Sequence, residues 1–202
     1  MGRKRSILFV PDAREASAPR RGGDADPRAP QGEEDTLAPF DADNRDEWWW
    51  RQPKWSRQEW RLETGGRTVA FMKGESLFSS TAHVRFADTV FDLHRGWTGN
   101  YELRREGSPE ALARFVPRWS GGGRLEMPAG DRLEVVSKGF WKSTLEVRTD
   151  EEHTLVRFES HDSLTRHEVQ VLPEDPARER DDLPVVLALA AAVLFAPKRH
   201  TY

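Results

Sequence analysis

Short runs in which hydrophobic and polar residues alternate fill the chain between residues 48 and 171. Glycine, aspartate and asparagine separate these runs at close, regular intervals. Alternation with a period of two is typical of strands that bury one face, and frequent turn residues are typical of antiparallel sheets. Gly65 and Gly66 join two of the runs, and paired glycines supply the positive φ angles of a tight hairpin turn. The pattern predicts twelve strands, the first over residues 48–50.

The run 183–196 is different because it is apolar throughout, and Pro197 follows it directly. A helix with no polar face must be buried in protein or in lipid. A helix of this length spans about 21 Å, whereas the hydrocarbon core of a bilayer is about 30 Å thick. A closed sheet of twelve strands encloses a lumen that its own side chains do not fill, and a helix about 10 Å across fits there. We therefore predict a mainly β fold: a closed antiparallel barrel of about twelve strands around a central hydrophobic C-terminal helix.

The remaining segments complete the predicted domain organisation. Residues 1–45 carry few apolar residues and no periodicity, which indicates a disordered N-terminal tail. The barrel is expected over residues 46–197, and residues 198–202 form a short basic tail. The apolar run at residues 7–10 is shorter than the roughly 7–15 residues that a signal peptide needs, so we expect a cytoplasmic protein, with peripheral attachment to a membrane left open.

Charge and composition exclude several classes of protein. The 31 Lys and Arg residues against 34 Asp and Glu residues give a formal charge of −3. Nucleic acid or anionic lipid would therefore have to bind at a local basic patch. The chain has no cysteine, which excludes disulfides, thiolate zinc sites and cysteine nucleophiles.

A weak internal repeat is present at offsets of 63 to 65 residues. It predicts two half-barrels of similar design. The first set of segments is 61–63, 73–74 and 84–85, and the second set is 124–126, 138–139 and 147–148.

Several segments resemble the opening of the LURP-one-related proteins: 50–54, 60–62 with its glycine hairpin, 71–74 and 79–80. These proteins belong, with the phospholipid scramblases and the tubby C-terminal domain, to a superfamily whose fold is a twelve-strand barrel around a central hydrophobic helix. The resemblance covers residues 48–196 and implies a non-catalytic module, since tubby domains bind phosphoinositides and scramblases act on membrane lipids. The calcium-binding segment of the scramblases is not matched, because Asp181 and Asp182 lack the alternate spacing of calcium ligands. No phosphoinositide-binding pair of bases can be carried over.

Four tryptophans and three bases lie within ten residues at the start of the predicted barrel. Such a cluster suits a lipid interface, where indole rings favour the headgroup level and bases meet phosphate, or a protein-binding patch. The alternative is that alternate rings pack inside the barrel, as we also expect for Trp97, Trp119 and Trp141. The candidate binding residues in this cluster are Trp48, Trp49, Arg51, Lys54, Trp55 and Arg57.

A second candidate site is a groove of bases that holds an anionic headgroup, and its alternative is ordinary solubilising charge. The residues of this predicted groove are Arg104, Arg105, Arg114, Arg118, Lys138 and Lys142.

No motif in the sequence predicts a reaction. His161, Asp162 and Ser163 are consecutive, so the histidine cannot lie between a nucleophile and its orienting acid. The six histidines show no paired spacing of metal ligands, and Gly121–Gly123 opens no helix, so it predicts a sharp corner of the barrel. We therefore expect no enzyme activity, no metal and no cofactor.

The leading functional hypothesis is a binding or scaffold module that interacts peripherally with a membrane or with anionic lipid, and nucleic acid is not expected as a partner. The alternatives are a protein-interaction module and a tail-anchored membrane protein that uses residues 183–196.

Overall fold

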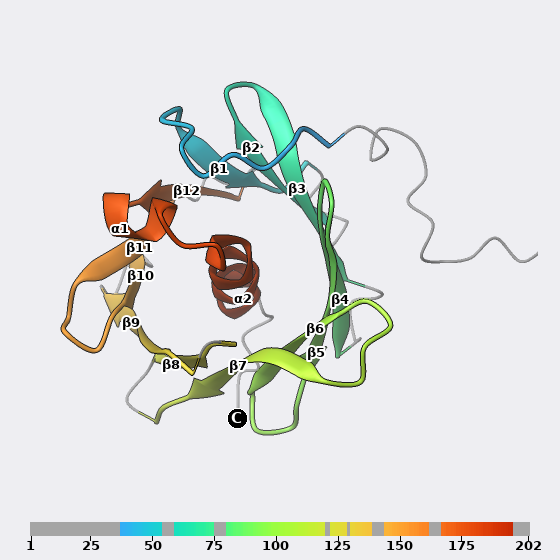
Figure 1. Cartoon of the computed structure of the whole chain (residues 1–202), viewed down its shortest axis with the longest axis vertical. Helices are drawn as coiled ribbons and strands as arrows, with labels where there is room; N and C mark the ends of the chain where they lie inside the picture. Colours follow the sequence, from blue (N-terminus) through green and yellow to red (C-terminus); the bar gives the residue numbers. More distant parts are fainter. Residues whose placement is uncertain are drawn as a thin grey trace, which may run out of the picture.

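The computed structural model describes residues 37–53, 59–74, 80–119, 122–128, 130–138, 144–161 and 167–195. Its twelve strands follow one another around a closed barrel, and every neighbouring pair is antiparallel (Figure 1). The last strand pairs with the first, Trp48 opposite Val171 and Trp50 opposite Val169. The predicted fold, a closed twelve-strand antiparallel barrel with a hydrophobic C-terminal helix at its centre, is confirmed.

The strands and helices have the following bounds: β1 Trp48–Arg51, β2 Glu59–Thr64, β3 Arg67–Gly74, β4 Thr81–Phe86, β5 Val90–Arg95, β6 Tyr101–Arg105, β7 Ala111–Pro117, β8 Gly123–Glu126, β9 Arg132–Lys138, β10 Thr144–Arg148, β11 Thr154–Ser160, β12 Glu168–Pro173, α1 Asp175–Arg178 and α2 Leu183–Phe195.

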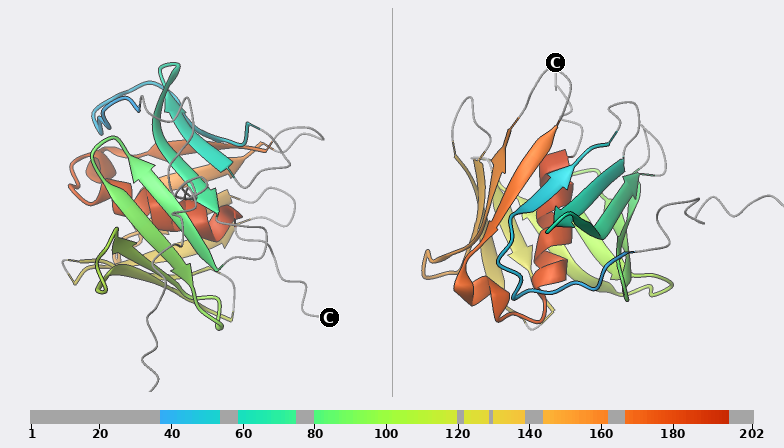
Figure 2. Two further views of the ribbon diagram at one scale, coloured as in Figure 1. Left: turned by 90° about the vertical axis from the view of Figure 1, so that its right-hand side faces the viewer. Right: turned by 90° about the horizontal axis from the view of Figure 1, so that it is seen from above.

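The barrel has two distinct ends, because the connections of an antiparallel barrel alternate between them. The connections that follow even-numbered strands, together with α1, lie where α2 begins, and we call this the entry end. The connections that follow odd-numbered strands lie where α2 finishes, and we call this the exit end. The right-hand view of Figure 2 shows α1 and the segment before β1 at the entry end, where α2 begins.

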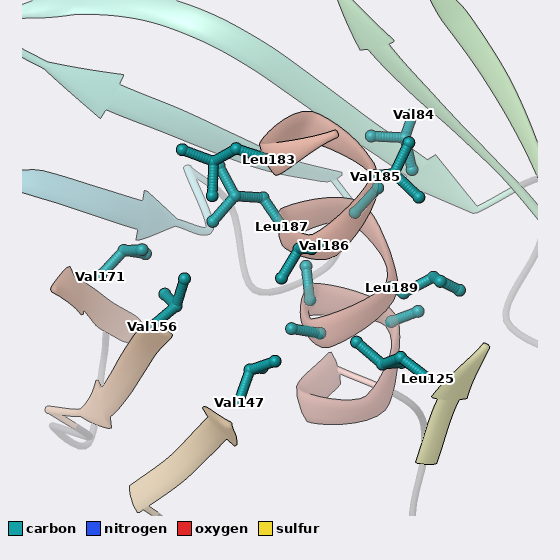
Figure 3. Close-up of a cluster of buried hydrophobic side chains, with 14 of the residues drawn as sticks. Val84, Leu125, Val147, Val156, Val171, Leu183, Val185, Val186, Leu187 and Leu189 are labelled. Atoms are coloured by element: carbon teal, nitrogen blue, oxygen red, sulfur yellow. The ribbon is translucent and has the colours of Figure 1, made fainter. Parts of the chain in front are cut away.

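The central helix is held by the inward faces of the strands. Residues 183 and 185–192 are buried, and Leu187 and Leu189 are fully enclosed. Figure 3 shows Val84 of β4, Val147 of β10 and Val171 of β12 pointing toward the helix from different walls of the barrel. Each such side chain contributes about 1.5–3 kcal/mol when it leaves water. A helix without a polar face is therefore stable here, because it meets strands on all sides.

At the exit end, aromatic rings close the packing around α2. The rings of Phe195 and Trp60 are stacked, with centroids 3.6 Å apart and planes 8° from parallel. Trp50 meets Phe195 edge-on at 6.1 Å. Among the described helices none has the length and apolarity needed to cross a membrane.

Residues 37–47 lie across the entry end, although residues up to 45 were assigned to the disordered tail. The ring of Phe40 packs edge-on against Trp48 at 5.4 Å and Phe86 at 5.3 Å. Arg178 of α1 donates from Nη1 to the backbone oxygens of Ala42 (2.8 Å) and Asn44. The tail boundary is thus corrected: one aromatic side chain and backbone hydrogen bonds dock a segment that has no periodic pattern. Residues 1–36 and 196–202, which include the rest of the predicted tails, lie outside the described residues.

The repeated segments of the sequence fall on strands six positions apart around the barrel. Segments 61–63 and 124–126 lie in β2 and β8, and segments 84–85 and 147–148 lie in β4 and β10. This placement agrees with the prediction of two half-barrels of similar design.

Candidate functional site

The tryptophans of β1 divide between the two faces of the barrel wall. Trp48 and Trp50 point inward and are 1% and 0% exposed. Trp49 points outward and is half-buried beside Arg51. The alternate packing predicted for this strand is confirmed, and it removes Trp48 from the candidate binding surface because its ring has no contact with solvent.

The positive charge of Arg51 is neutralised by two neighbouring carboxylates. Its Nη1 donates to Glu63 Oε2 at 2.8 Å, its Nε lies 3.3 Å from Glu168 Oε1, and its guanidinium lies over the ring of Trp49 at 5.4 Å. An open groove of about 330 Å³ borders these side chains, and its other lining groups include the carboxylates of Asp46 and Glu47. The groove is therefore acidic and does not suit an anion. The other residues predicted for this cluster, Lys54, Trp55 and Arg57, lie outside the described residues.

The predicted groove of bases is not formed as one site. Arg104 and Arg114 share Glu102: Arg104 Nη2 donates a hydrogen bond to Oε2 at 2.8 Å, and Arg114 Nε lies 3.3 Å from Oε1 as an ion pair. The hydrogen bond from Arg104 lowers the pKa of the Glu102 carboxyl, and this outweighs the opposite effect of burial. Arg105 ends β6 at the entry end, whereas Arg118 follows β7 at the exit end. The bases do not form one site because Arg104 and Arg105 are consecutive in β6, and successive residues of a strand point to opposite faces. Lys142 lies outside the described residues.

Among the described residues three large hydrophobic side chains are exposed, and these lie at one corner of the exit end: Trp97, Val116 and Trp119. Trp97 and Trp119 are 99% and 108% exposed, and Val116 is 42% exposed. The expectation that Trp97 and Trp119 pack inside the barrel is therefore wrong, and Trp141 lies outside the described residues. We call these three residues the aromatic corner.

The turn that carries Trp97 is tight and well defined. Gly96 N donates to the backbone oxygen of Asn100 at 2.9 Å, and the Thr98 hydroxyl donates to the side-chain oxygen of Asn100 at 2.8 Å. Gly99 has φ +81°, a conformation that L side chains rarely adopt. These contacts fix the backbone of the turn that carries the exposed Trp97 ring.

The two loops of the aromatic corner lie against each other. β6 and β7 are paired with Tyr101 opposite Phe115, which brings the residues before β6 next to those at the end of β7. A Cβ on Gly99 would lie 3.9 Å from Pro117 Cγ, which is ordinary contact distance. Trp97 and Trp119 therefore project from adjoining segments, which gives the corner two exposed rings.

A wall of bases on the outer face of β8–β11 adjoins the aromatic corner. Glu134 of β9 lies between Arg124 and Arg148 in the strand register and accepts a hydrogen bond from Arg118 Nη2 at 2.7 Å. Arg118 directly precedes Trp119 in the sequence, so it links the wall to the corner. Members of the wall are the bases Arg118, Arg124, Lys138, Arg148 and Arg157 and the acids Glu134 and Glu146. We call these residues the basic wall.

Glu146 lies at the centre of three of these bases. Its side chain is 6% exposed, and Lys138 Nζ lies 3.0 Å from Oε2 and Arg148 Nε 2.9 Å from the same oxygen. Arg157 Nε lies 3.5 Å from Oε1. Burial alone would raise the pKa of the Glu146 carboxyl, but hydrogen bonds from Arg148 and Lys138 outweigh it and lower the pKa. Arg124, Arg148 and Arg157 were missed by the sequence analysis because only the strand register brings them together.

The entry end has the opposite charge. Two bases in the connections at this end are engaged internally, since Arg178 binds backbone oxygens and Arg180 pairs with Asp182 and Asp131. Three further bases, Arg67, Arg105 and Arg132, lie at strand ends on the same side. Acidic residues dominate the described connections at this end: Asp88, Glu106, Glu110, Asp131, Asp150, Glu151, Glu152, Glu174, Asp175, Glu179, Asp181 and Asp182. The barrel is therefore polarised, with carboxylates at one end and the aromatic corner at the other.

Comparison of the chain with protein-family models, with curated proteins and with solved structures found no match. Within the described part of the chain, no group of three His, Asp or Glu side chains is placed to hold a metal ion. In the described part of the chain, α2 and the inward strand residues fill the interior of the barrel, and the charged clusters lie on its outer surface.

Proposed function

We propose that the protein is a non-enzymatic module that binds peripherally to a membrane surface containing anionic lipid. The exit end would face the bilayer. The observation that carries this proposal is the pair of fully exposed tryptophans, Trp97 and Trp119, on adjoining loops beside the basic wall. The resemblance of residues 48–196 to the LURP-one-related proteins and the scramblases agrees with it, because that superfamily includes proteins that act at membranes.

The magnitudes favour membrane insertion of the corner. A tryptophan side chain offers about 150–250 Å² of surface, so removing one ring from water contributes about 4–6 kcal/mol at most. Two rings can therefore offset a large part of the 4–15 kcal/mol that association costs in lost freedom of motion. Indole rings also favour the headgroup level, where neighbouring bases meet phosphate.

Electrostatics then fixes the orientation. The carboxylates of the entry end are repelled by an anionic surface, whereas the basic wall next to Arg118 is attracted to it. The two effects turn the same end of the barrel toward the membrane. Only the attraction is expected to weaken when salt is added, since ring insertion does not depend on charge.

Co-sedimentation with vesicles tests this proposal. We expect the purified full chain to be retained on phosphatidylcholine vesicles containing phosphatidylserine, and the double variant Trp97→Ala/Trp119→Ala to lose most of that retention. Trp49→Ala is the matched control, because Trp49 lies on the outer wall away from the corner. Equal retention of all three folded proteins, or no retention of the wild type at low salt, would contradict the proposal.

A second candidate function, protein interaction, is favoured by the acidic groove beside Trp49. Its lining by Asp46, Glu47 and Glu63 suits a lysine or arginine side chain of a partner. A pull-down with full-length bait, with bait lacking residues 1–36 and with bait carrying Glu47→Gln would test it. Loss of a partner only with Glu47→Gln would support the groove, and an unchanged set of partners would argue against it.

A further inference from the structure

The open groove of about 330 Å³ beside Trp49 is lined by two carboxylates that no base neutralises. Among the described residues, the Asp46 carboxylate forms no ion pair, and Glu47 Oε2 accepts a hydrogen bond from the indole Nε1 of Trp49 at 3.1 Å. The Asp46 carboxylate lies against Gly65, where a Cβ would collide with it. The hollow of the groove therefore borders two negative charges without a bound cation of the barrel itself.

The surroundings of the groove do not supply the missing positive charge. Segments 41–47 and 63–67 carry five acids and two bases, namely Asp41, Asp43, Asp46, Glu47 and Glu63 against Arg45 and Arg67. Arg51 lies between Glu63 and Glu168, and Arg61 lies opposite Arg51 on β2, which makes six acids to four bases. Residues 174–179 around α1, which pairs with Arg45 through Asp175, add three acids and one base. Each of these counts leaves an excess of at least two negative charges.

The N-terminal segment of the chain is tethered beside this groove. Ala38 N donates to the backbone oxygen of Thr68 at 2.9 Å. Thr68 lies opposite Glu63, a lining residue of the groove, in the register of β2 and β3. Residues 1–36 are therefore connected to the barrel next to the groove.

Charge is distributed unevenly along residues 1–36. Residues 1–21 contain six bases and two acids, whereas residues 22–36 contain one base and five acids. An acidic groove repels the second part and attracts the first. Arg3, Lys4 and Arg5 are consecutive and form the densest positive charge of the attracted part.

We propose that Arg3, Lys4 and Arg5 of the chain's own N-terminal segment dock in the acidic groove beside Trp49. The inference rests on the second candidate function, in which the groove receives basic side chains, and it names their source. The docked segment is autoinhibitory, because a basic partner can reach Asp46 and Glu47 only by displacing it.

Magnitudes favour the tethered segment over a separate basic peptide. Exposed ion pairs contribute little each, so three of them give a dissociation constant on the order of millimolar at best. About 32 residues join Arg5 to Leu37, and a chain of that length without regular structure, as the sequence predicts here, has a root-mean-square length of about 30 Å. Such a tether keeps its end at a local concentration in the millimolar range. The chain's own bases therefore occupy the groove for a substantial fraction of the time, whereas a micromolar peptide that makes the same ion pairs does not.

A spin label tests the docking, and the absence of cysteine from the chain makes the labelling specific. A nitroxide on Gly2→Cys of the full chain is expected to broaden the amide NMR signals of Thr64 and Gly66 at low salt. About 1 M salt should remove the broadening, because charges are then screened beyond about 3 Å. The variant Asp46→Asn/Glu47→Gln should abolish it at low salt.

The matched control is Asp150→Asn/Glu151→Gln, which removes two exposed acids from another connection of the entry end. This control should leave the broadening unchanged. Absence of broadening in the otherwise unaltered chain would overturn the proposal. Equal loss in the two acid variants would also overturn it, because the tail would then be attracted to the whole entry end rather than bound in the groove.

A charge exchange tests direct pairing between the two segments. Arg3→Glu/Lys4→Glu/Arg5→Glu should lose the broadening, and combining it with Asp46→Lys/Glu47→Lys should restore it. Should the lysine variant fail to fold, the tail variant still decides, since unchanged broadening in that protein would contradict docking through these bases.

A synthetic peptide of residues 1–10 separates this inference from the function of the groove. The peptide is added at millimolar concentration to Arg3→Gln/Lys4→Gln/Arg5→Gln, and we expect shifts of the Thr64 and Gly66 signals that Asp46→Asn/Glu47→Gln removes. Such shifts without broadening in the spin-labelled chain would leave the groove as a site for basic partners and overturn the autoinhibitory docking. Absence of both effects would overturn the docking and the second candidate function together.

Discussion

Two pairs of tryptophans in this barrel have opposite environments. Trp48 and Trp50 lie in a strand, at alternate positions that point into the lumen, and they are almost fully buried. Trp97 and Trp119 lie in connections at the exit end and are fully exposed. The same side chain therefore stabilises the fold in one place and is available to a partner in the other. The difference comes from the position in the barrel, because the period of two that buries a ring applies within a strand and ends where the strand ends.

The largest effect is expected where a charge enters the inside of the barrel. Leu189→Asp places an unpaired carboxylate in a fully enclosed part of α2 and should abolish folding to a soluble protein. Val193→Asp is the matched comparison, because Val193 is only partly buried near the exit end and should be less damaging. Solubility and circular dichroism measure both variants. A soluble, cooperatively unfolding Leu189→Asp protein would mean that α2 does not occupy the lumen.

The next largest effect on stability is expected for Trp50, one of the two buried rings of β1. Trp50→Ala removes a fully enclosed side chain and should lower the free energy of unfolding by about 3–5 kcal/mol. Urea denaturation followed by circular dichroism measures the change, with Trp97→Ala as the control. A loss below about 1 kcal/mol for Trp50→Ala would be too small for an enclosed ring.

Truncation of the exposed pair should leave stability almost unchanged. Trp97→Ala/Trp119→Ala is expected to shift the free energy of unfolding by no more than about 0.5 kcal/mol per site, because neither ring is buried. The same variant should lose the part of the tryptophan fluorescence that acrylamide quenches most readily. Strong destabilisation, or unchanged quenching, would show that these rings are packed against the protein.

The smallest expected effect concerns the basic wall. Its contribution to stability should depend on pH, whereas the contributions of the two tryptophan pairs should not. Because the folded-state pKa of Glu146 is lowered, its ionised form stabilises the fold above the ordinary pKa of a glutamate, and this contribution is lost as the pH falls through the folded-state value. Glu146→Gln should therefore be less stable than the wild type at neutral pH, and the difference should shrink in acid. Thermal unfolding across this range measures the trend, and a difference that is constant with pH would contradict it.

Strand positions could be predicted from the sequence, and loop exposure could not. The alternation of residues 48–50 predicts two inward rings, and the apolar run from Leu183 predicts a buried helix, since both depend on local patterns. Trp97 was expected inside because large burial is the usual reason for a tryptophan, although it lies between two predicted strands. The residues Gly96, Gly99 and Asn100 around it are typical of a turn and are the signal that indicates exposure.

The site depends on contacts between residues far apart in the chain. Glu146 meets Arg157 because β10 and β11 pair in one register, and a shift by one residue would turn either side chain to the other face. Alternation does not determine this register. The docked segment before β1 was missed for a similar reason, because it is held by distant elements: Phe40 packs against Trp48 and Phe86, and Arg178 of α1 binds its backbone oxygens.

The central position of α2 determines when the protein can fold. The helix follows all twelve strands in the chain, yet its side chains fill the space that those strands enclose, and β1 must also wait for β12. During synthesis on the ribosome, the sheet has no partner for its apolar face until Phe195 has been made. Incomplete chains therefore expose an apolar concave surface. Nascent barrels should depend on chaperones until the last turn of the helix has left the ribosome.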